Sequence, residues 1–111
     1  MDYLRYLAEF RQIAQSNRWT PLHTPRNLAC AISVEAAELL EQFQWLSDEA
    51  SDAIAVASEH HNAIASEVAD ILLYTFALCE RMGIDPERAL NTKIDANRGR
   101  FLKDDNDRLQ L

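Results

Sequence analysis

The stretch HHNAIASEVADILLYTFALCERMG, residues 60–83, decides the fold of this chain. Its apolar residues recur at helical spacing over more than half of the circumference, which predicts a long helix from His60 to Met82. Gly83 is expected to end this helix, because glycine readily adopts the left-handed conformation of a C-cap. A helix that is apolar on nearly every side needs cover from several directions, so we expect other elements to pack around it.

Two amphipathic helices are predicted before this central helix. The first spans about residues 2–17, and the second runs from about residue 26 or 27 to residue 45. The connection between them, residues 18–27, contains Pro21 and Pro25. It is longer than an ordinary connection, which favours a functional role for it.

Two further helices complete the pattern. A short helix is expected within residues 46–58, with Ser47 or Asp48 as its N-cap. The sequence Asp85-Pro86-Glu87 supplies an N-cap, a proline and an acidic residue for the first turn of a last helix, which reaches about residue 100 or 101.

Composition agrees with an all-α domain. The chain of 111 residues has only 2 glycines and 3 prolines, too few for the turns of a barrel or a sandwich, and no segment alternates long enough to indicate a strand. We therefore predict one bundle of four to five helices, formed by residues 1–102, and a charged tail, residues 103–111.

The charge balance limits the partners of this domain. It carries 18 acidic and 11 basic side chains, a formal net charge of −7. The resulting field repels a polyanion, which argues against a nucleic acid polymer as partner. A small anion that arrives together with a metal ion is still compatible with this charge.

The location of the protein is predicted from its first residues and its cysteines. Met1–Phe10 interleaves charged with apolar residues, so it resembles neither a signal peptide nor a membrane span. Cys30 and Cys79 are too few for a disulfide framework and are expected to be reduced packing residues. We expect a cytoplasmic protein with no membrane partner.

The central helix also predicts self-association. Four modest helices cover its apolar surface poorly, so we expect a second copy of the chain to complete the core. Closed two-fold assembly is the commonest arrangement of this kind.

Two acidic pairs border the apolar faces of neighbouring helices. Glu35 and Glu38 lie at the edge of the stripe in the second helix, and Glu67 and Asp70 lie at the edge of the stripe in the central helix. One such pair alone most often marks a solvated helix face. If the two helices pack antiparallel, however, all four carboxylates converge in a semi-buried place and repel one another.

A bound cation would relieve this repulsion. Oxygen-only ligands suit a hard cation such as Mg²⁺, with Mn²⁺ as a second candidate. A redox di-iron bundle would instead place histidine three residues after glutamate, and neither pair does so.

Basic and aromatic residues offer contacts for a nucleotide. Lys93, Asn97 and Arg100 share one face of the last helix, where a polyphosphate could bind, although a solvated helix end explains them about equally well. Flat side chains suitable for a nucleobase occur in the long connection and at the end of the second helix, although for each aromatic ring packing is the commoner role. These candidates are Trp19, His23, Arg26 and Trp45.

Four ordered motifs resemble a known family. They are His23-Thr-Pro-Arg-Asn27, Ser33-Val-Glu35-Ala-Ala-Glu38-Leu-Leu-Glu41-Gln-Phe-Gln-Trp45, Glu67-Val-Ala-Asp70-Ile-Leu-Leu-Tyr74 and Lys93-Ile-Asp-Ala-Asn97-Arg98. In this order and spacing they resemble the MazG-like all-α nucleoside triphosphate pyrophosphohydrolases, and within them the small dCTP-pyrophosphatase type. The resemblance covers about residues 3–102.

This resemblance implies cleavage of a nucleoside triphosphate, dCTP or dATP first among the candidates, to monophosphate and pyrophosphate, as in housecleaning of the nucleotide pool. It implies a magnesium site made of the two acidic pairs, a MazG-like bundle that forms a homodimer or homotetramer, and a pocket lined by two chains. Phosphate or sugar contacts are implied for Tyr74, Lys93 and Asn97, and contacts near the base for Trp19, His23 and Trp45.

The residues and the resemblance lead to one catalytic hypothesis. Glu38 is expected to act as general base toward a water that attacks the α-phosphorus, and Lys93 to stabilise charge on the phosphates. A non-catalytic helical dimerisation module that binds a basic partner is the alternative. A hydrolase specific for another nucleotide, such as dUTP, is a second alternative.

Overall fold

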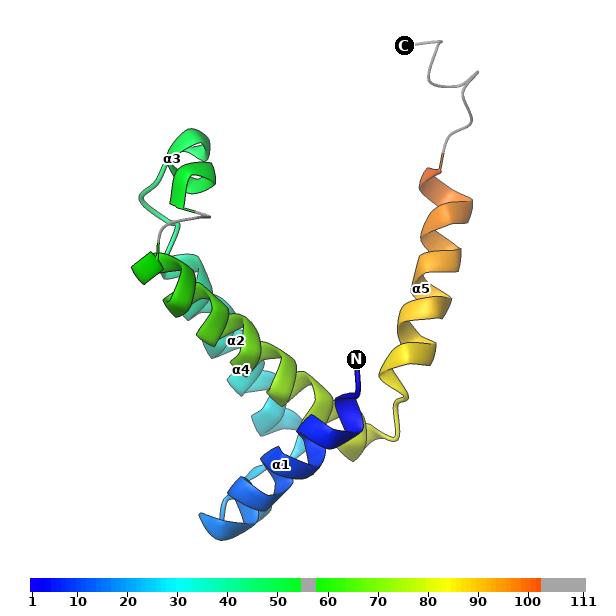
Figure 1. Cartoon of the computed structure of the whole chain (residues 1–111). Coiled ribbons are helices and arrows are strands. Elements are labelled where there is room, and N and C mark those ends of the chain that lie inside the picture. Colours follow the sequence, from blue (N-terminus) through cyan, green and yellow to red (C-terminus); the bar gives the residue numbers. More distant parts are fainter. Residues whose placement is uncertain (55–57, 103–111) are drawn as a thin grey trace.

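The computed structural model describes residues 1–54 and 58–102, and every regular element within them is helical. The all-α prediction is therefore confirmed, and the predicted tail, residues 103–111, lies outside the described residues. Figure 1 shows the order of the elements. They are α1 (Tyr3–Ser16), the 3₁₀ turn η1 (Thr20–Leu22), α2 (Pro25–Glu41), α3 (Asp48–Ala53), α4 (Ser58–Met82) and α5 (Pro86–Phe101).

Local sequence chemistry sets the helix boundaries. A short polar side chain accepts a hydrogen bond from a first-turn N–H at the start of four helices, which satisfies a donor that has no partner within the helix. Gly83 ends α4 with a φ of 66°, as expected for a left-handed C-cap. The N-caps are Asp2 of α1, Thr24 of α2, Ser47 of α3 and Asp85 of α5.

The second helix begins next to its predicted start but ends before its predicted end at residue 45. Helix α2 begins earlier, at Pro25, because Thr24 caps it and proline fits the first turn. It ends at Glu41 rather than at residue 45, because the chain tightens there. The N–H of Phe43 donates to the carbonyl of Leu40, and the N–H of Leu46 donates to the carbonyl of Phe43, each across three residues.

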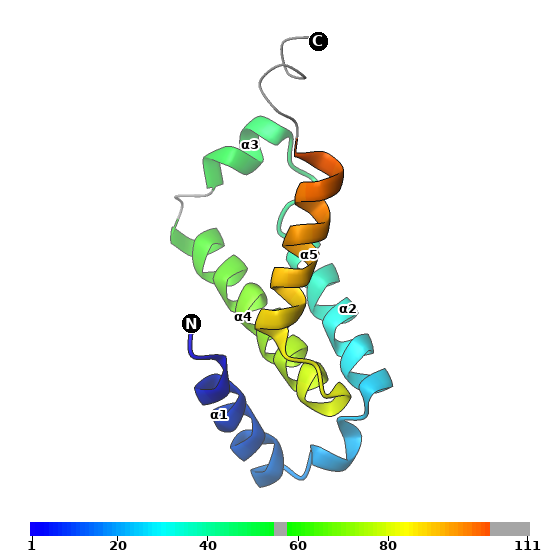
Figure 2. The same ribbon diagram turned by 90° about the vertical axis from the view of Figure 1, so that its right-hand side faces the viewer.

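Helices α2 and α4 form the main packed pair. They lie side by side and run antiparallel, and α1 packs against the C-terminal half of α4 (Figure 2). Leu7 of α1, Leu28 of α2 and Ala77 of α4 form the buried core where the three helices meet. The antiparallel packing that the candidate site requires is therefore present.

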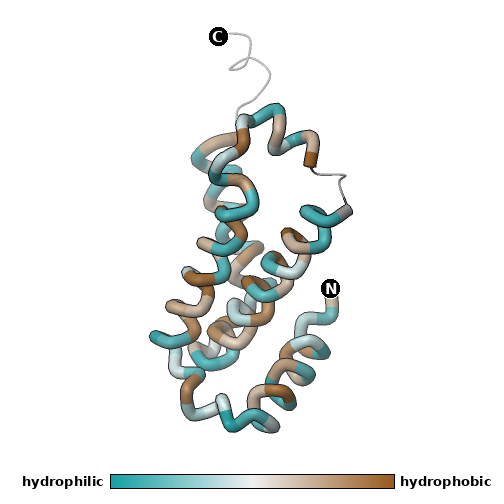
Figure 3. The backbone as a smooth tube through the Cα atoms, turned by 90° about the vertical axis from the view of Figure 1, so that its left-hand side faces the viewer, coloured by the Kyte–Doolittle hydropathy of each residue, from teal (hydrophilic) through white to brown (hydrophobic). Residues whose placement is uncertain are grey.

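Much apolar surface of the described chain lies outside this core. Helix α5 extends away from the other helices in Figure 1, and apolar positions recur along it in Figure 3. Leu90 and Ile94 of α5 are 62% and 53% exposed. Apolar side chains on both helix α4 and helix α5 thus lack cover within one chain.

Helix α4 is also the described element whose length and composition would suit a membrane span, over Glu59–Met82. Its middle carries Glu67 and Asp70, and it packs against α1 and α2. We therefore interpret α4 as the central helix of the bundle.

Leu28 is 1% exposed in the buried core, so we predict that a shorter side chain at this position destabilises the fold. Leu28→Ala removes buried methyl groups and leaves a cavity, so the free energy of unfolding should fall by about 2–5 kcal/mol. Urea denaturation monitored by circular dichroism measures this change. Leu40→Ala, on an exposed position of the same helix, is the matched control, and equal losses for the two variants would contradict the proposed core.

Candidate functional site

Three carboxylates from two helices meet at the contact between α2 and α4. One oxygen from each of Glu35, Glu38 and Glu67 lies within 4.8 Å of the corresponding oxygens of the other two. All three side chains are half-buried. The spacing of three residues places Glu35 and Glu38 on one face of α2, and that face packs against α4. The predicted convergence of the acidic pairs therefore holds for these three residues.

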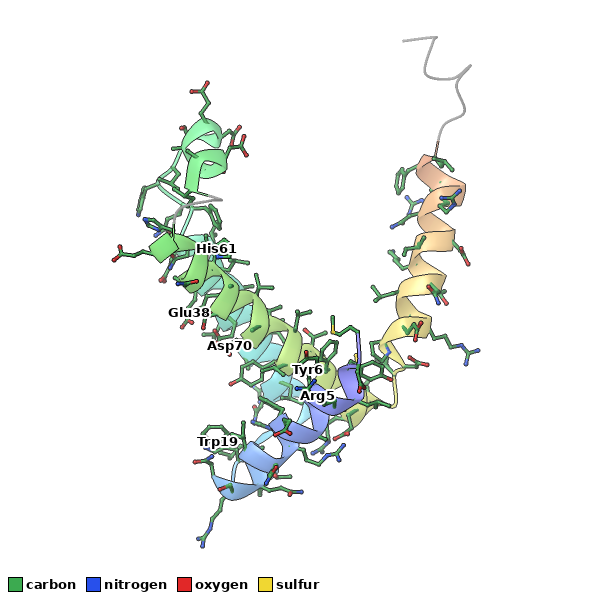
Figure 4. All side chains as sticks on the ribbon, viewed as in Figure 1. Arg5, Tyr6, Trp19, Glu38, His61 and Asp70 are labelled. Atoms are coloured by element: carbon green, nitrogen blue, oxygen red, sulfur yellow. The ribbon has the colours of Figure 1, made fainter. Side chains whose placement is uncertain are left out.

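Asp70, the fourth predicted ligand, lies one turn beyond Glu67 on α4 and is half-buried. It is not among the three closest carboxylates, but its charge is near enough to contribute to the raised pKa of Glu35. In Figure 4 Glu38 and Asp70 lie near one another along the α2–α4 pair. Asp70 thus borders the carboxylate cluster of Glu35, Glu38 and Glu67.

The cluster is electrostatically strained without a cation. Glu35 Oε2 and Glu67 Oε2 are buried and have no hydrogen-bond partner among the described residues. The adjacent carboxylate of Glu67, then burial, then Glu38 raise the pKa of Glu35 from its ordinary value of 4.5 to about 7. Glu35 therefore takes up a proton at a higher pH than an ordinary glutamate does.

This donor set suits a divalent cation. In the described part of the chain, no basic side chain forms an ion pair with the cluster, and the ion pair found there, Arg11 with Glu80, joins α1 to α4 elsewhere. Three carboxylate oxygens at this spacing, two of them lacking donors, fit the oxygen ligands of a hard cation. A metal ion bound there would replace the proton that the raised pKa of Glu35 favours.

An aromatic cluster lies next to the carboxylates. The imidazole of His23 stacks on Phe10, with ring centroids 5.6 Å apart and planes 10° apart, and Tyr74 meets Phe10 edge-on at 5.5 Å. Trp19 is tilted against His23 at 6.5 Å. Tyr74 links the two clusters, because burial and then the charges of Glu35 and Asp70 raise the pKa of its hydroxyl.

The structure therefore brings together three of the predicted nucleotide contacts, Trp19, His23 and Tyr74. It also adds Phe10, which sequence reasoning missed. Phe10 occupies an apolar position in the amphipathic pattern of α1, so its only sequence signal was that of an ordinary core residue.

The other predicted contacts are exposed, and they belong to neither the carboxylate cluster nor the aromatic cluster. Arg26 is exposed in the first turn of α2, and Trp45 is 89% exposed in the turns that follow it. The remaining three are exposed on α5, which extends away from the α2–α4 pair (Figure 1). They are Lys93, Asn97 and Arg100.

Sequence comparison relates the chain to nucleotide pyrophosphatases. The sequence model of the MazG-like family matches residues 30–110. The chain is similar to dCTP pyrophosphatase 1 of Rattus norvegicus, with 39% identity over 100 residues, and to dCTP pyrophosphatase 1 of Homo sapiens, with 36% identity. These matches cover 90% of this chain and 57% of each relative, so the chain spans little more than half the length of these curated relatives.

A structural comparison agrees with the sequence matches. The chain is similar to a crystal structure of a pyrophosphatase from Archaeoglobus fulgidus, with a TM-score of 0.84 and 34% sequence identity. The similarity covers 93% of this chain and 94% of the archaeal chain.

The raised pKa of Glu35 predicts the pH dependence of the metal-free protein. Since the folded state takes up this proton near pH 7 and the unfolded state near pH 4.5, the stabilisation by the proton is fully present below 4.5 and lost as the pH rises through about 7. The melting temperature in EDTA should therefore rise from pH 8 to pH 5 more in the native protein than in Glu35→Gln, which is neutral throughout. Thermal unfolding followed by circular dichroism tests this difference, and equal pH slopes would contradict the raised pKa of Glu35.

Proposed function

The chain belongs to the MazG-like family, and on this premise we propose that it is a Mg²⁺-dependent nucleoside triphosphate pyrophosphohydrolase. The proposed reaction converts a deoxynucleoside triphosphate and water to the monophosphate and pyrophosphate, as in housecleaning of the nucleotide pool. The names of the relatives, dCTP pyrophosphatase 1, favour dCTP as the substrate. We include dATP as a second candidate.

The single observation that carries this proposal is the carboxylate cluster. Glu35, Glu38 and Glu67 hold three oxygens within 4.8 Å of one another, and two buried carboxylate oxygens have no partner among the described residues. Such an arrangement is costly unless a proton or a cation occupies it. We favour Mg²⁺ over softer metals because all the donors are carboxylates, and Mn²⁺ would fit the same ligands.

The same observation weighs against the alternative, a non-catalytic module that binds a basic partner. A docking surface needs exposed acidic side chains that a lysine or arginine can reach. The three carboxylates of the cluster are instead half-buried between α2 and α4. We therefore prefer the enzymatic function.

Bound Mg²⁺ would supply neutralisation of the triphosphate charge and would lower the pKa of a nearby water. Glu35, Glu67 and Asp70 would hold the cation, together with Glu38. We assign Glu38 as the general base that accepts the proton of the attacking water. As the water oxygen bonds to the α-phosphorus, the bond from this phosphorus to the bridging oxygen breaks, and pyrophosphate leaves with that oxygen.

The aromatic cluster would orient the nucleoside. Tyr74 contacts the aromatic rings, and burial, then the nearby charges of Glu35 and Asp70, raise its pKa, which supports our proposal that its hydroxyl contacts the sugar or a phosphate. Trp19 and His23 offer flat faces for the base. We keep Arg26 and Trp45 as further candidates near the nucleotide, and their exposure leaves both side chains accessible to it.

A second copy of the chain would complete the site. The apolar Leu90 and Ile94 of α5 are uncovered in one chain, and the neighbouring Lys93 and Asn97 lie apart from the carboxylates. We propose that α5 packs on another protomer in a homodimer or homotetramer and brings Lys93, Asn97 and Arg100 to the partner's bound phosphates. Lys93 would then stabilise the charge that develops on the phosphates.

Removal of one carboxylate tests the proposed reaction. Glu38→Ala should lower kcat by at least about 10²-fold, to a level without detectable turnover, because it removes both a ligand and the general base. Asp70→Ala should abolish turnover as well, because it removes a ligand of the cation. The measurement is pyrophosphate release from dCTP, dATP and dUTP with and without Mg²⁺. Glu41→Ala, an exposed position on the same helix, is the matched control and should retain activity.

Circular dichroism of each variant checks that the helices are intact. Unchanged Mg²⁺-dependent activity in both Glu38→Ala and Asp70→Ala would refute the assignment. Preferred hydrolysis of dUTP over dCTP and dATP would favour a dUTP-specific enzyme instead.

A complementation experiment tests the shared site. Glu38→Ala and Lys93→Ala chains should each be inactive alone, but a heterodimer of them contains one site with both native residues. Random assembly of equal amounts into dimers should therefore restore about a quarter of the native activity. The absence of any recovery, with mixed dimers demonstrated by differential tagging, would show that Lys93 does not act across the interface.

A further inference from the structure

Phe10 is a described aromatic residue next to the candidate site that the proposed mechanism does not use. Its ring comes from α1, the imidazole that it stacks on comes from the connection after η1, and Tyr74 comes from α4. Helix α4 is far from the other two elements in the sequence, so Tyr74 meets the rings of Phe10 and His23 only because α4 packs against α1. A ring that joins three elements at a binding site is placed to fix the orientation of its neighbours.

The backbone of His23 is well anchored, whereas its side chain is held by aromatic contacts. Its N–H donates to the carbonyl of Thr20, the next residue caps α2, and Asn27 Nδ2 donates to the carbonyl of Leu22. Among the described residues, no hydrogen bond holds the imidazole ring itself. Its orientation therefore depends on the rings around it, and the nearly parallel stack on Phe10 is the most restrictive of these contacts.

We propose that Phe10 is a positioning residue that holds the imidazole of His23 in place for nucleotide binding. Phe10 covers one face of the imidazole, so a flat ligand can stack only on the opposite face. A fixed ring loses little freedom when the ligand arrives, which strengthens binding. Phe10 acts through His23 and does not itself touch the nucleotide. This inference rests on the proposed function, because it takes His23 as a nucleotide contact.

The first test removes the ring and keeps an apolar side chain of similar bulk. In Phe10→Leu, the ring-proton resonances of His23 should move downfield, because the ring current of the stacked phenyl group is lost. This NMR measurement uses the free protein and needs no substrate. Phe10→Tyr keeps the aromatic ring and should leave these resonances close to their native positions.

The second test measures nucleotide affinity without turnover. The probe is a dCTP analogue with a methylene group between the α- and β-phosphorus, titrated in the presence of Mg²⁺ by calorimetry. Phe10→Leu should weaken its binding about five- to tenfold, the size expected from one aromatic pair. With dCTP itself, KM should rise by a similar factor while kcat changes less than about twofold. Phe10→Tyr should restore both values.

Tyr3→Leu is the matched control for a general loosening of α1. Tyr3 pairs with Phe76 across the same contact between α1 and α4, with ring centroids 5.6 Å apart, and it belongs to neither cluster of the candidate site. This variant should lose thermal stability as Phe10→Leu does, but it should keep native His23 resonances and native affinity. Equal losses of affinity in the two variants would overturn the proposal.

A double-mutant cycle decides whether Phe10 acts through His23. In a His23→Ala background, Phe10→Leu should cause almost no further loss of affinity for the analogue. A full additional loss would overturn the proposal, because Phe10 would then act independently of the imidazole. Native protein that binds the analogue but releases no pyrophosphate from any nucleotide would refute the proposed function alone, and native protein that does not bind it would refute both.

Discussion

Repulsion among the carboxylates on the contact between α2 and α4 is the constraint on which the candidate site depends. Apolar residues in place of Glu35 and Glu67 would pack between these helices at a lower free-energy cost, because two buried carboxylate oxygens there lack hydrogen-bond partners. In the metal-free chain, the raised pKa of Glu35 favours proton uptake, which reduces the repulsion. The carboxylates of Glu67 and Glu38 that contribute to this raised pKa are also those that, with Glu35, fit a divalent cation. Proton binding, metal binding and helix packing are therefore coupled at one place.

The helices could be predicted from the sequence because their signals are local. Ser47, Asp85 and Gly83 each act within a few residues, and the structure confirms all three as caps or as a helix end. The end of the second helix was missed because Phe43 and Leu46 continue an apolar pattern, although the backbone there has already tightened into turns. The spacing of apolar residues indicates which side chains face the core. It does not indicate whether each N–H donates to the carbonyl four residues back, as in an α-helix, or three residues back, as in a turn.

The sequence likewise predicted only part of the candidate site. Glu35, Glu38 and Glu67 could be found because acidic residues on the edge of an apolar stripe must face a neighbouring helix. Phe10 could not, because an apolar residue in α1 has the same pattern whether it packs on the core alone or, as Phe10 does, also stacks on the imidazole of His23. Only the tertiary packing of α1 on α4 distinguishes these two cases.

The separation of the two kinds of functional residue follows from how the helices pack. The carboxylates lie on the α2–α4 pair, which a single chain assembles, whereas the basic residues lie on α5, which a single chain leaves uncovered. If α5 packs on a second copy, burial of its Leu90 and Ile94 would bring Lys93 toward the phosphates in the same step. Burial of these apolar side chains would then provide the free energy that holds the ammonium group of Lys93 beside the triphosphate. A single chain would bind the metal ion but would lack this positive charge to stabilise the leaving pyrophosphate. In such an arrangement assembly and catalysis depend on the same helix.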